Sequence, residues 1–146
     1  MDSVYEGGCL CGAVRYRVRG KPVVSVACHC KFCQRRLGSA FATFAYFDET
    51  NLEFTQGHVT EYEHRSDESG RWLRLQFCTR CGTTVTHMAQ GRPGQRALAV
   101  GTLDEPDWLG IERHVWVRSK RPWVSIPLDV AAFPQGSAGA TAPKAS

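Results

Sequence analysis

Residues 28–33 read CHCKFC, so three cysteines, one histidine and one lysine share six consecutive positions. Clustered cysteines are typically metal ligands or catalytic thiols in a reducing compartment. The chain has seven cysteines, an odd number, and its start, MDSVYEGGCLCG, lacks the basic and hydrophobic regions of a signal peptide. No apolar run approaches the roughly 20 residues that cross a bilayer. We therefore expect a cytoplasmic protein without a membrane partner, whose cysteines bind metal.

Two further pairs of cysteines flank this segment, Cys9 with Cys11 and Cys78 with Cys81. Four thiolates bound to zinc at about 2.3 Å form a closed tetrahedral site of the structural type. The first pair must bend to bring its sulfurs together, and a glycine on each side gives the backbone that freedom. The second pair needs only a four-residue turn, and Gly82 follows it where a metal-binding turn often requires a positive φ. These four cysteines make a plausible structural zinc site.

The remaining set, Cys28, Cys30 and Cys33, is one ligand short of a tetrahedron. Three thiolates hold zinc and leave one position for water or a substrate atom, which distinguishes a catalytic zinc site from a structural one. A thiol bound there loses its proton more readily, and a carbonyl group bound there is polarised. His29 is an alternative fourth ligand, but a residue between two ligands usually points away from the metal. Spacing alone also permits other pairings, such as the first pair of cysteines with Cys28 and Cys30.

The rest of the sequence predicts one mainly β domain. Short β-branched and aromatic segments alternate with Gly, Pro, Asp and Asn, as in antiparallel sheets. These segments are 13–18, 23–27, 40–47, 52–55, 59–64, 71–77, 83–88, 97–100 and 114–117. One short helix is expected at 31–38, closed by Gly38, and a second helical turn at 104–108 is an option. The small, polar residues 134–146 predict a disordered tail after a domain of residues 1–133.

The net charge argues against a nucleic-acid partner. The formal charge is +4 when every cysteine is a neutral thiol. Seven thiolates and two Zn²⁺ ions would add seven negative and four positive charges, which leaves +1. Two small basic clusters, KFCQRRLG and VRSKRP, are the counter-argument. Because no continuous basic stripe alternates with aromatic residues, nucleic-acid binding is disfavoured.

Five segments together carry a family resemblance. They are GGCLCGAVRY (7–16), CHCKFCQRRLGSAF (28–41), FCTRCGTTV (77–85), GTLDEP (101–106) and RHVWVRSKRPW (113–123). In order and spacing they resemble the glutathione-dependent formaldehyde-activating enzyme family, whose domain also occurs in centromere protein V. The resemblance covers residues 5–125, and the pattern of seven cysteines is far more specific than any one pair.

The resemblance implies a β-tent fold of stacked antiparallel sheets pinned by two zinc ions, one structural and one catalytic. The ligands implied for the structural ion are Cys9, Cys11, Cys78 and Cys81. Those implied for the catalytic ion are Cys28, Cys30 and Cys33. The founding enzyme joins formaldehyde to the thiol of glutathione to give S-hydroxymethylglutathione, formally a carbon–sulfur lyase reaction. A small thiol and an aldehyde are therefore the expected substrates.

Basic residues beside the three-cysteine motif are candidates to bind the carboxylates of an anionic thiol such as glutathione. They are Lys31, Arg35 and Arg36. A solvated face of a short helix is an equally good interpretation of the same residues. The histidines expected on sheet faces or in loops, rather than as ligands, are His58, His64, His87 and His114.

Several other residues have expected structural roles. Asp104 is expected to cap the turn that follows it. One of the tryptophans is an alternative lining residue for the pocket. The residues expected in the core are Phe32, Phe41, Trp108, Trp116 and Trp123.

A zinc-stabilised binding module is the alternative function, because formaldehyde also adds to thiols without a catalyst and one fold serves many functions. Such a module would carry a small thiol or bind a protein or nucleic acid. A zinc deaminase is disfavoured because the H-x-E and P-C-x-x-C motifs are absent. A thioredoxin-like role is disfavoured because strands and helices do not alternate.

Overall fold

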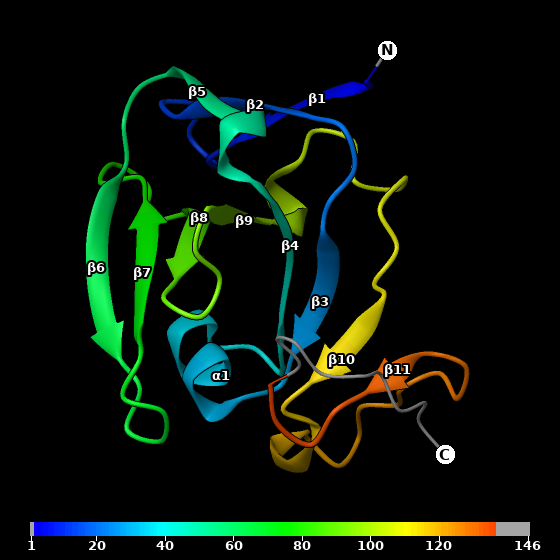
Figure 1. Ribbon diagram of the computed structural model, residues 1–146. Coiled ribbons are helices and arrows are strands. Elements are labelled where there is room, and N and C mark those ends of the chain that lie inside the picture. The colour runs from blue at the N-terminus through cyan, green and yellow to red at the C-terminus, as the bar shows by residue number, and fades with distance from the viewer. Residues whose placement is uncertain (1, 137–146) are drawn as a thin grey trace. The chain divides into compact units, whose positions relative to one another are not determined.

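The computed structural model describes residues 2–136, which form two compact units (Figure 1). The first unit contains the described residues up to Val23 together with Ala45–Trp108. The second contains Val24–Phe44 together with the described residues from Leu109 onward. Both units contain strands, and α1 (Lys31–Leu37) is the one α-helix in the described part of the chain. The prediction of a mainly β fold with one short helix is confirmed.

The small sheet of the first unit has the strand order β1-β2-β5, and both pairs are antiparallel. Its strands are β1 (Val4–Gly8), β2 (Arg15–Arg19) and β5 (Leu52–Gln56). The alternating sequence RYRVR in β2 buries Tyr16 and Val18 and leaves the arginines partly or fully exposed. β1 ends immediately before the first pair of cysteines, so this sheet fixes the place of that pair in the first unit.

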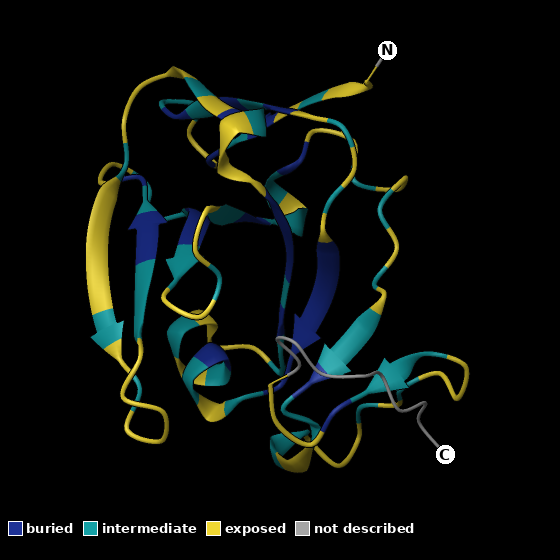
Figure 2. Ribbon diagram, in the orientation of Figure 1, coloured by how far each residue is buried: buried dark blue, intermediate teal, exposed yellow. Residues whose placement is uncertain are grey.

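The first unit also contains four antiparallel strands in the order β9-β8-β7-β6. They are β6 (Thr60–Arg65), β7 (Trp72–Phe77), β8 (Thr84–Ala89) and β9 (Gln95–Ala99). Two 3₁₀ helices belong to the same unit, η1 (Glu49–Asn51) and η2 (Val100–Thr102). Figure 2 shows β6 as mostly exposed and β7 and β8 as partly buried. The turn between β7 and β8 carries the second pair of cysteines.

The sheet of the second unit is built from β3 (Val24–Cys28), β10 (Arg113–Val115) and β11 (Ala131–Ala132). β10 pairs in parallel with both of its neighbours. The sequence patterns indicate antiparallel pairing, but the long connection between β3 and β10 allows the parallel arrangement. β3 is buried at all five positions (Figure 2), including the polar Ser25, whose hydroxyl donates to the carbonyl of Gly110. It ends on the first cysteine of CHCKFC, and α1 follows directly.

Each expected strand segment corresponds to a strand, with β4 (Ala42–Asp48) covering 40–47 and divided between the two units. The last segment is shorter than expected, because Trp116 has a φ of 58° and Val117–Ser119 continues as the 3₁₀ helix η3. The sequence does not indicate β1, which ends in two glycines, or β11, which has two residues. Residues 104–108 form bends and a turn in place of the optional helical turn.

The predicted tail begins at Pro134, and its first residues lie in the described part of the chain. The carbonyl groups of Pro134 and Gln135 accept hydrogen bonds from the amides of Arg118 and Trp116. The rest of the predicted tail, residues 137–146, lies outside the described residues. Among the described residues, the structure contains no helix of the length and apolarity that a membrane span requires.

Candidate metal centres

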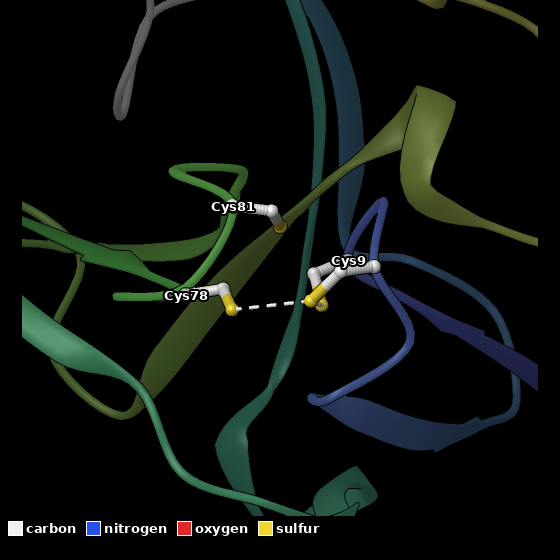
Figure 3. Close-up of side chains that lie close together, drawn as sticks. Cys9, Cys78 and Cys81 are labelled. Carbon is white, nitrogen blue, oxygen red and sulfur yellow. Dashed lines mark hydrogen bonds between the residues drawn. The ribbon is translucent and has the colours of Figure 1, made fainter.

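The four-sulfur cluster, formed by Cys9, Cys11, Cys78 and Cys81, lies in the first unit. Its sulfurs all lie within 4.8 Å of one another. The Sγ atoms of Cys9 and Cys11 are 3.7 Å apart, and those of Cys11 and Cys78 are 3.8 Å apart. Figure 3 shows the side chains of Cys9, Cys78 and Cys81 turned toward one another. These distances suit the edges of a zinc tetrahedron with Zn–S bonds of about 2.3 Å.

A tight bend after β1 brings the first pair of sulfurs together. The amide of Cys9 donates to the carbonyl of Val14, and the amide of Gly12 donates to the carbonyl of Cys9. The amide of Val14 in turn donates to the sulfur of Cys9 at 3.3 Å. The strand period would hold residues i and i+2 about 7 Å apart. These three bonds replace the extended conformation with the bend that the sequence requires.

The second pair of the cluster lies on the turn from β7 to β8. The amide of Gly82 donates to the carbonyl of Cys78 at 2.8 Å, and the amide of Cys78 donates to the carbonyl of Thr83 at 3.0 Å. Gly82 has a φ of 78°, as the sequence predicts for this metal-binding turn. The Thr83 hydroxyl also accepts from the amide of Leu10, which joins the two halves of the cluster.

The thiols of the four-sulfur cluster differ in acidity. A hydrogen bond with the Thr83 hydroxyl is the main reason that the pKa of Cys81 falls to about 5. The Ala13 amide lowers the pKa of Cys11, but partial burial and the neighbouring sulfurs, that of Cys9 first, raise it to about 11. A cation among the sulfurs would therefore favour the thiolate form of Cys11. A set of four soft sulfur donors at tetrahedral spacing fits zinc.

The three-sulfur cluster, formed by Cys28, Cys30 and Cys33, lies in the second unit, again with all sulfurs within 4.8 Å of one another. Cys28 ends β3, Cys30 is the N-cap of α1, and Cys33 lies in the first turn of that helix. The amide of Cys33 donates to the Sγ of Cys30 at 3.2 Å, so a sulfur takes the usual place of an N-cap oxygen. Cys28 and Cys33 are buried, whereas Cys30 is half-buried.

Among the described residues, no His, Cys, Asp or Glu joins these three sulfurs as a fourth ligand. His29 lies between two of them, but its Nε2 is 2.8 Å from the Nδ1 of His114 and its side chain is fully buried. The interpretation of His29 as a fourth ligand therefore has no support in this geometry. The three-sulfur cluster offers an incomplete tetrahedron.

The three thiols differ strongly in pKa. Interactions with the thiols of Cys28 and Cys33 lower the pKa of Cys30 to about 3, with a smaller contribution from the charge of Arg36. The Cys28 thiol lowers the pKa of Cys33, but Cys30 and burial raise it to about 12. Interaction with Cys30 is the main cause that raises the pKa of Cys28 far above its ordinary value. One thiolate is stable alone, and three require a cation, so this donor set also fits zinc.

The basic residues expected near the three-cysteine motif separate into two groups. Lys31 and Arg35 are exposed and line a surface hollow of about 770 Å³. Arg36 is not among its lining residues; its guanidinium lies 5.9 Å from the centre of the Phe32 ring, and its charge acts on Cys30. Arg121 also lines the hollow, and the sequence marks it only through the basic cluster VRSKRP and the family resemblance, not as a neighbour of the three-cysteine motif.

The tryptophans expected in the core are half-buried or exposed instead. Trp123 is 72% exposed and lines the hollow beside α1, so the prediction of a core position is wrong, while the alternative that a tryptophan lines the substrate pocket stays a prediction. Trp108 is 36% exposed and stacks on Tyr5 with ring centroids 3.9 Å apart. Trp116 is half-buried under the guanidinium of Arg118.

The remaining expected residues have structural positions. Asp104 binds the guanidinium of Arg15, so it pairs with β2 where the sequence suggests a cap. His87 is buried and lies 3.1 Å from the Tyr46 hydroxyl. His64 lies on β6 and His58 in the preceding loop, as expected. Phe41, half-buried, packs with its ring centre 5.1 Å from that of His29, and Phe32 is also half-buried.

A comparison with protein families adds the decisive observation. The model of the family described as "Glutathione-dependent formaldehyde-activating enzyme" matches residues 4–119. The chain belongs to this family. All seven cysteines lie within the matched residues, so both clusters are part of the family domain.

Individual relatives of this family member are distant. A Halomonas elongata protein named as a candidate glutathione-dependent formaldehyde-activating enzyme is 26% identical over 125 residues, which cover 83% of this chain and 80% of the relative. An uncharacterized lyase of Schizosaccharomyces pombe is 30% identical over 82 residues, or 56% of this chain and 55% of the relative. A crystal structure of a Rhodobacter sphaeroides protein matches with a TM-score of 0.56 and 25% identity, covering 73% of this chain and 96% of that one. This likeness confirms the fold expected of the family.

Proposed function

We propose that the protein adds a small anionic thiol to an aldehyde at the three-sulfur cluster. With glutathione and formaldehyde, the product would be S-hydroxymethylglutathione, and the reverse cleavage would be that of a carbon–sulfur lyase. One observation carries the proposal, namely that Cys28, Cys30 and Cys33 converge without a fourth protein ligand among the described residues. Membership of the glutathione-dependent formaldehyde-activating enzyme family supports the same reaction.

The residues would hold two zinc ions with different tasks. The four-sulfur cluster has the complete donor set of a structural ion, whereas the three-sulfur cluster has the donor set of a catalytic one. Zinc bound by the latter would lower the pKa of a coordinated thiol and polarise a nearby carbonyl group. Arg36 contributes positive charge beside this cluster and so favours thiolates there.

The proposed reaction is balanced without an oxidant or reductant. The thiol sulfur forms a bond to the carbonyl carbon, and the π electrons of the C=O bond move to oxygen. The proton released by the thiol ends on that oxygen, which gives a hydroxymethyl thioether. Because Cys30 is half-buried while Cys28 and Cys33 are buried, the substrate thiol would approach from the side of Cys30.

The hollow beside α1 would anchor the rest of the thiol. Lys31 and Arg35 line the hollow from the same helix that carries Cys33, and Arg121 adds a third cation. Among the described residues, no Asp or Glu lines this hollow, so its charge suits the carboxylates of a glutathione-like molecule. The exposed indole of Trp123 offers an apolar surface to the peptide backbone of such a substrate.

The experiment must separate catalysis from the uncatalysed reaction. At equilibrium, formaldehyde interconverts between its hydrate and its glutathione adduct. NMR exchange spectroscopy of its CH₂ signals measures the rate of this interconversion in the presence of a catalytic amount of protein. We expect zinc-loaded protein to raise the exchange rate well above that in buffer, and protein stripped of metal by a chelator to lose the effect. An exchange rate equal to that in buffer would reject the enzyme.

A binding module is the alternative, because formaldehyde adds to thiols without a catalyst and a site that only holds the thiol would have the same lining residues. In that case, glutathione would bind with one molecule per chain while the exchange rate stayed at the uncatalysed value. Calorimetry of glutathione binding on the same samples therefore decides between a carrier and an enzyme.

A further inference from the structure

His29 lies between two of the cluster cysteines in the sequence, Cys28 and Cys30. It is fully buried, and burying an imidazole is unfavourable unless its polar atoms are paired. Its Nε2 lies 2.8 Å from the Nδ1 of His114, with the two rings stacked at 25° and their centroids 5.1 Å apart. The ring of Phe41, at 5.1 Å between centroids, also packs against it. The imidazole of His29 is thus fixed by one hydrogen bond and by aromatic packing.

The backbone of His29 is fixed from the same direction. Its amide donates to the carbonyl of Val115 at 3.0 Å. Its carbonyl accepts from the Nε2 of Gln34 at 2.8 Å, and the same Nε2 donates to the carbonyl of Ser119 at 2.9 Å. The peptide groups between Cys28 and Cys30 are therefore tied to the segment 114–119, directly or through Gln34.

This supporting segment is strand β10 and the turn after it. β10 pairs in parallel with β3, with His114 opposite Ala27 and Val115 opposite Cys28. Next comes Trp116, the one described residue other than glycine with a positive φ, at 58°. That conformation costs roughly 1–2 kcal/mol for a residue with a side chain. It ends the strand beside the cluster and starts η3, whose last residue supplies the Ser119 carbonyl.

Burying the two imidazole rings has a desolvation cost, and packing alone does not explain why polar rings occupy this place. One nitrogen of each ring is used in the bond between His29 and His114. The other ring nitrogen of His29, Nδ1, is buried and has no hydrogen-bond partner among the described residues. It is also not within the cluster of potential ligand atoms, so it does not complete the tetrahedron. A leucine or phenylalanine would fill this space without an unpaired polar atom, which indicates that the polar pair serves another purpose.

We propose that His29 and His114 are positioning residues that hold the Cys28–Cys30 loop in the conformation that binds metal. The inference rests on metal binding at the three-sulfur cluster, as in the proposed function, but not on the identity of thiol or aldehyde. Only three thiolates would hold the metal here. They constrain the positions of the ligands less than a closed set of four would, so support from the surrounding residues matters more. Groups that orient metal ligands typically contribute 10–100-fold to affinity.

The test compares two replacements of His114 that differ in hydrogen bonding. Asparagine places a polar atom near the position of Nδ1, whereas leucine has a similar size and no polar atom. In the full-length protein carrying both metals, competition with a chromophoric chelator measures the zinc affinity of each site. We expect His114→Leu to lower affinity at the three-sulfur cluster about 10–100-fold. His114→Asn should stay close to wild type, and the four-sulfur cluster should be unchanged in both.

A control variant separates this effect from general loss of stability. His87 is also buried and hydrogen-bonded to the Tyr46 hydroxyl, but it lies in the first unit. His87→Leu should lower the melting temperature while leaving the affinity of the three-sulfur cluster unchanged. The proposal would be overturned if wild type, His114→Leu and His114→Asn had equal zinc affinity at the three-sulfur cluster. It would also be overturned if His87→Leu lost as much of that affinity as His114→Leu.

A second readout requires no metal and no activity. Hydrogen exchange of the amides at 28–33 in the metal-free protein reports the bond from His29 to Val115 directly. We expect faster exchange there in His114→Leu than in wild type or His114→Asn, and unchanged exchange would overturn the proposal. If His114→Leu is insoluble, His114→Ser, too short to reach His29, replaces it. Absence of thiol–aldehyde catalysis with these shifts present would reject only the proposed function.

Discussion

The four-sulfur and three-sulfur clusters are both built from cysteine sulfurs, but they connect the chain differently. In the first unit, the sulfurs of Cys11 and Cys78 meet across 67 positions of sequence. In the second unit, all three sulfurs come from six consecutive residues, between a buried strand and the helix that follows it. A metal bound to distant segments closes a long loop and stabilises the fold, whereas a metal bound to one local segment adds little to the fold. The difference supports the proposal that the complete site is structural and that the incomplete one can accept a substrate.

The largest expected effect is on the four-sulfur cluster. Replacing Cys78 and Cys81 together by serine leaves two ligands and removes the structural ion. Structural zinc contributes on the order of 10 kcal/mol, more than the whole stability of a typical domain. We expect this double variant to be insoluble or to lack the far-UV circular dichroism of the folded protein. A soluble variant with an unchanged melting temperature would show that the clusters do not differ in this way.

The matched change in the three-sulfur cluster should have a different result. Replacing Cys30 and Cys33 together by serine should leave the protein folded, with one zinc ion per chain by elemental analysis. We expect a cost of about 1–3 kcal/mol in stability, from the buried hydroxyl at Cys33. Catalysis should fall about 100-fold or more, because a zinc ion supplies several kcal/mol of transition-state stabilisation. Unfolding of this variant would assign a structural role to both clusters.

A smaller effect is expected at the hollow beside the three-sulfur cluster. Arg121→Gln removes one exposed cation, whose pairing with a carboxylate contributes up to about 1 kcal/mol. We expect the KM for glutathione to rise about fivefold with kcat unchanged. The KM for an uncharged thiol such as 2-mercaptoethanol should not change. Lys21→Gln, which removes an exposed cation from the first unit, is the control and should affect neither thiol.

The smallest expected effect compares one glycine beside each cluster. Gly82 ends the Cys78–Cys81 turn with a φ of 78°, and Gly38 ends α1 with a φ of 62°. A Cβ atom would meet nothing within 4 Å at either position, so alanine adds only backbone strain of roughly 1–2 kcal/mol. Each variant should lower the melting temperature by about 2–6 °C, as measured by calorimetry. A much larger decrease for Gly82→Ala would indicate that the metal-binding turn cannot relax.

The sequence predicts the clusters better than it predicts their surroundings. The metal chemistry depends on local spacing, so CHCKFC and Cys-x-x-Cys-Gly indicate the ligands and the helix that Gly38 closes. Strand segments are also visible, because burial imposes the alternation seen in RYRVR. The parallel pairing of β10 with β3 is not visible, because it depends on contacts between distant segments.

The residues around the three-sulfur cluster were the least predictable, because they too depend on contacts between segments that are distant in the sequence. The bond between His29 and His114 joins residues 85 positions apart, and nothing in either local sequence indicates it. Trp123 is an aromatic residue of the kind that usually packs in a core, yet it is 72% exposed and lines the hollow. Arg121 lines the same hollow because the chain after η3 returns to α1, which no pattern within SKRPW reveals.

The central claim is that the three-sulfur cluster holds a metal with one position left for a thiol, while the four-sulfur cluster is closed. Cadmium-113 NMR of protein with ¹¹³Cd in place of zinc tests it directly, because the chemical shift reports the number of sulfur ligands. The account predicts two resonances, of which glutathione moves one, and that one is missing when Cys30 and Cys33 are both serine. A single resonance, or two that glutathione leaves unchanged, would contradict it.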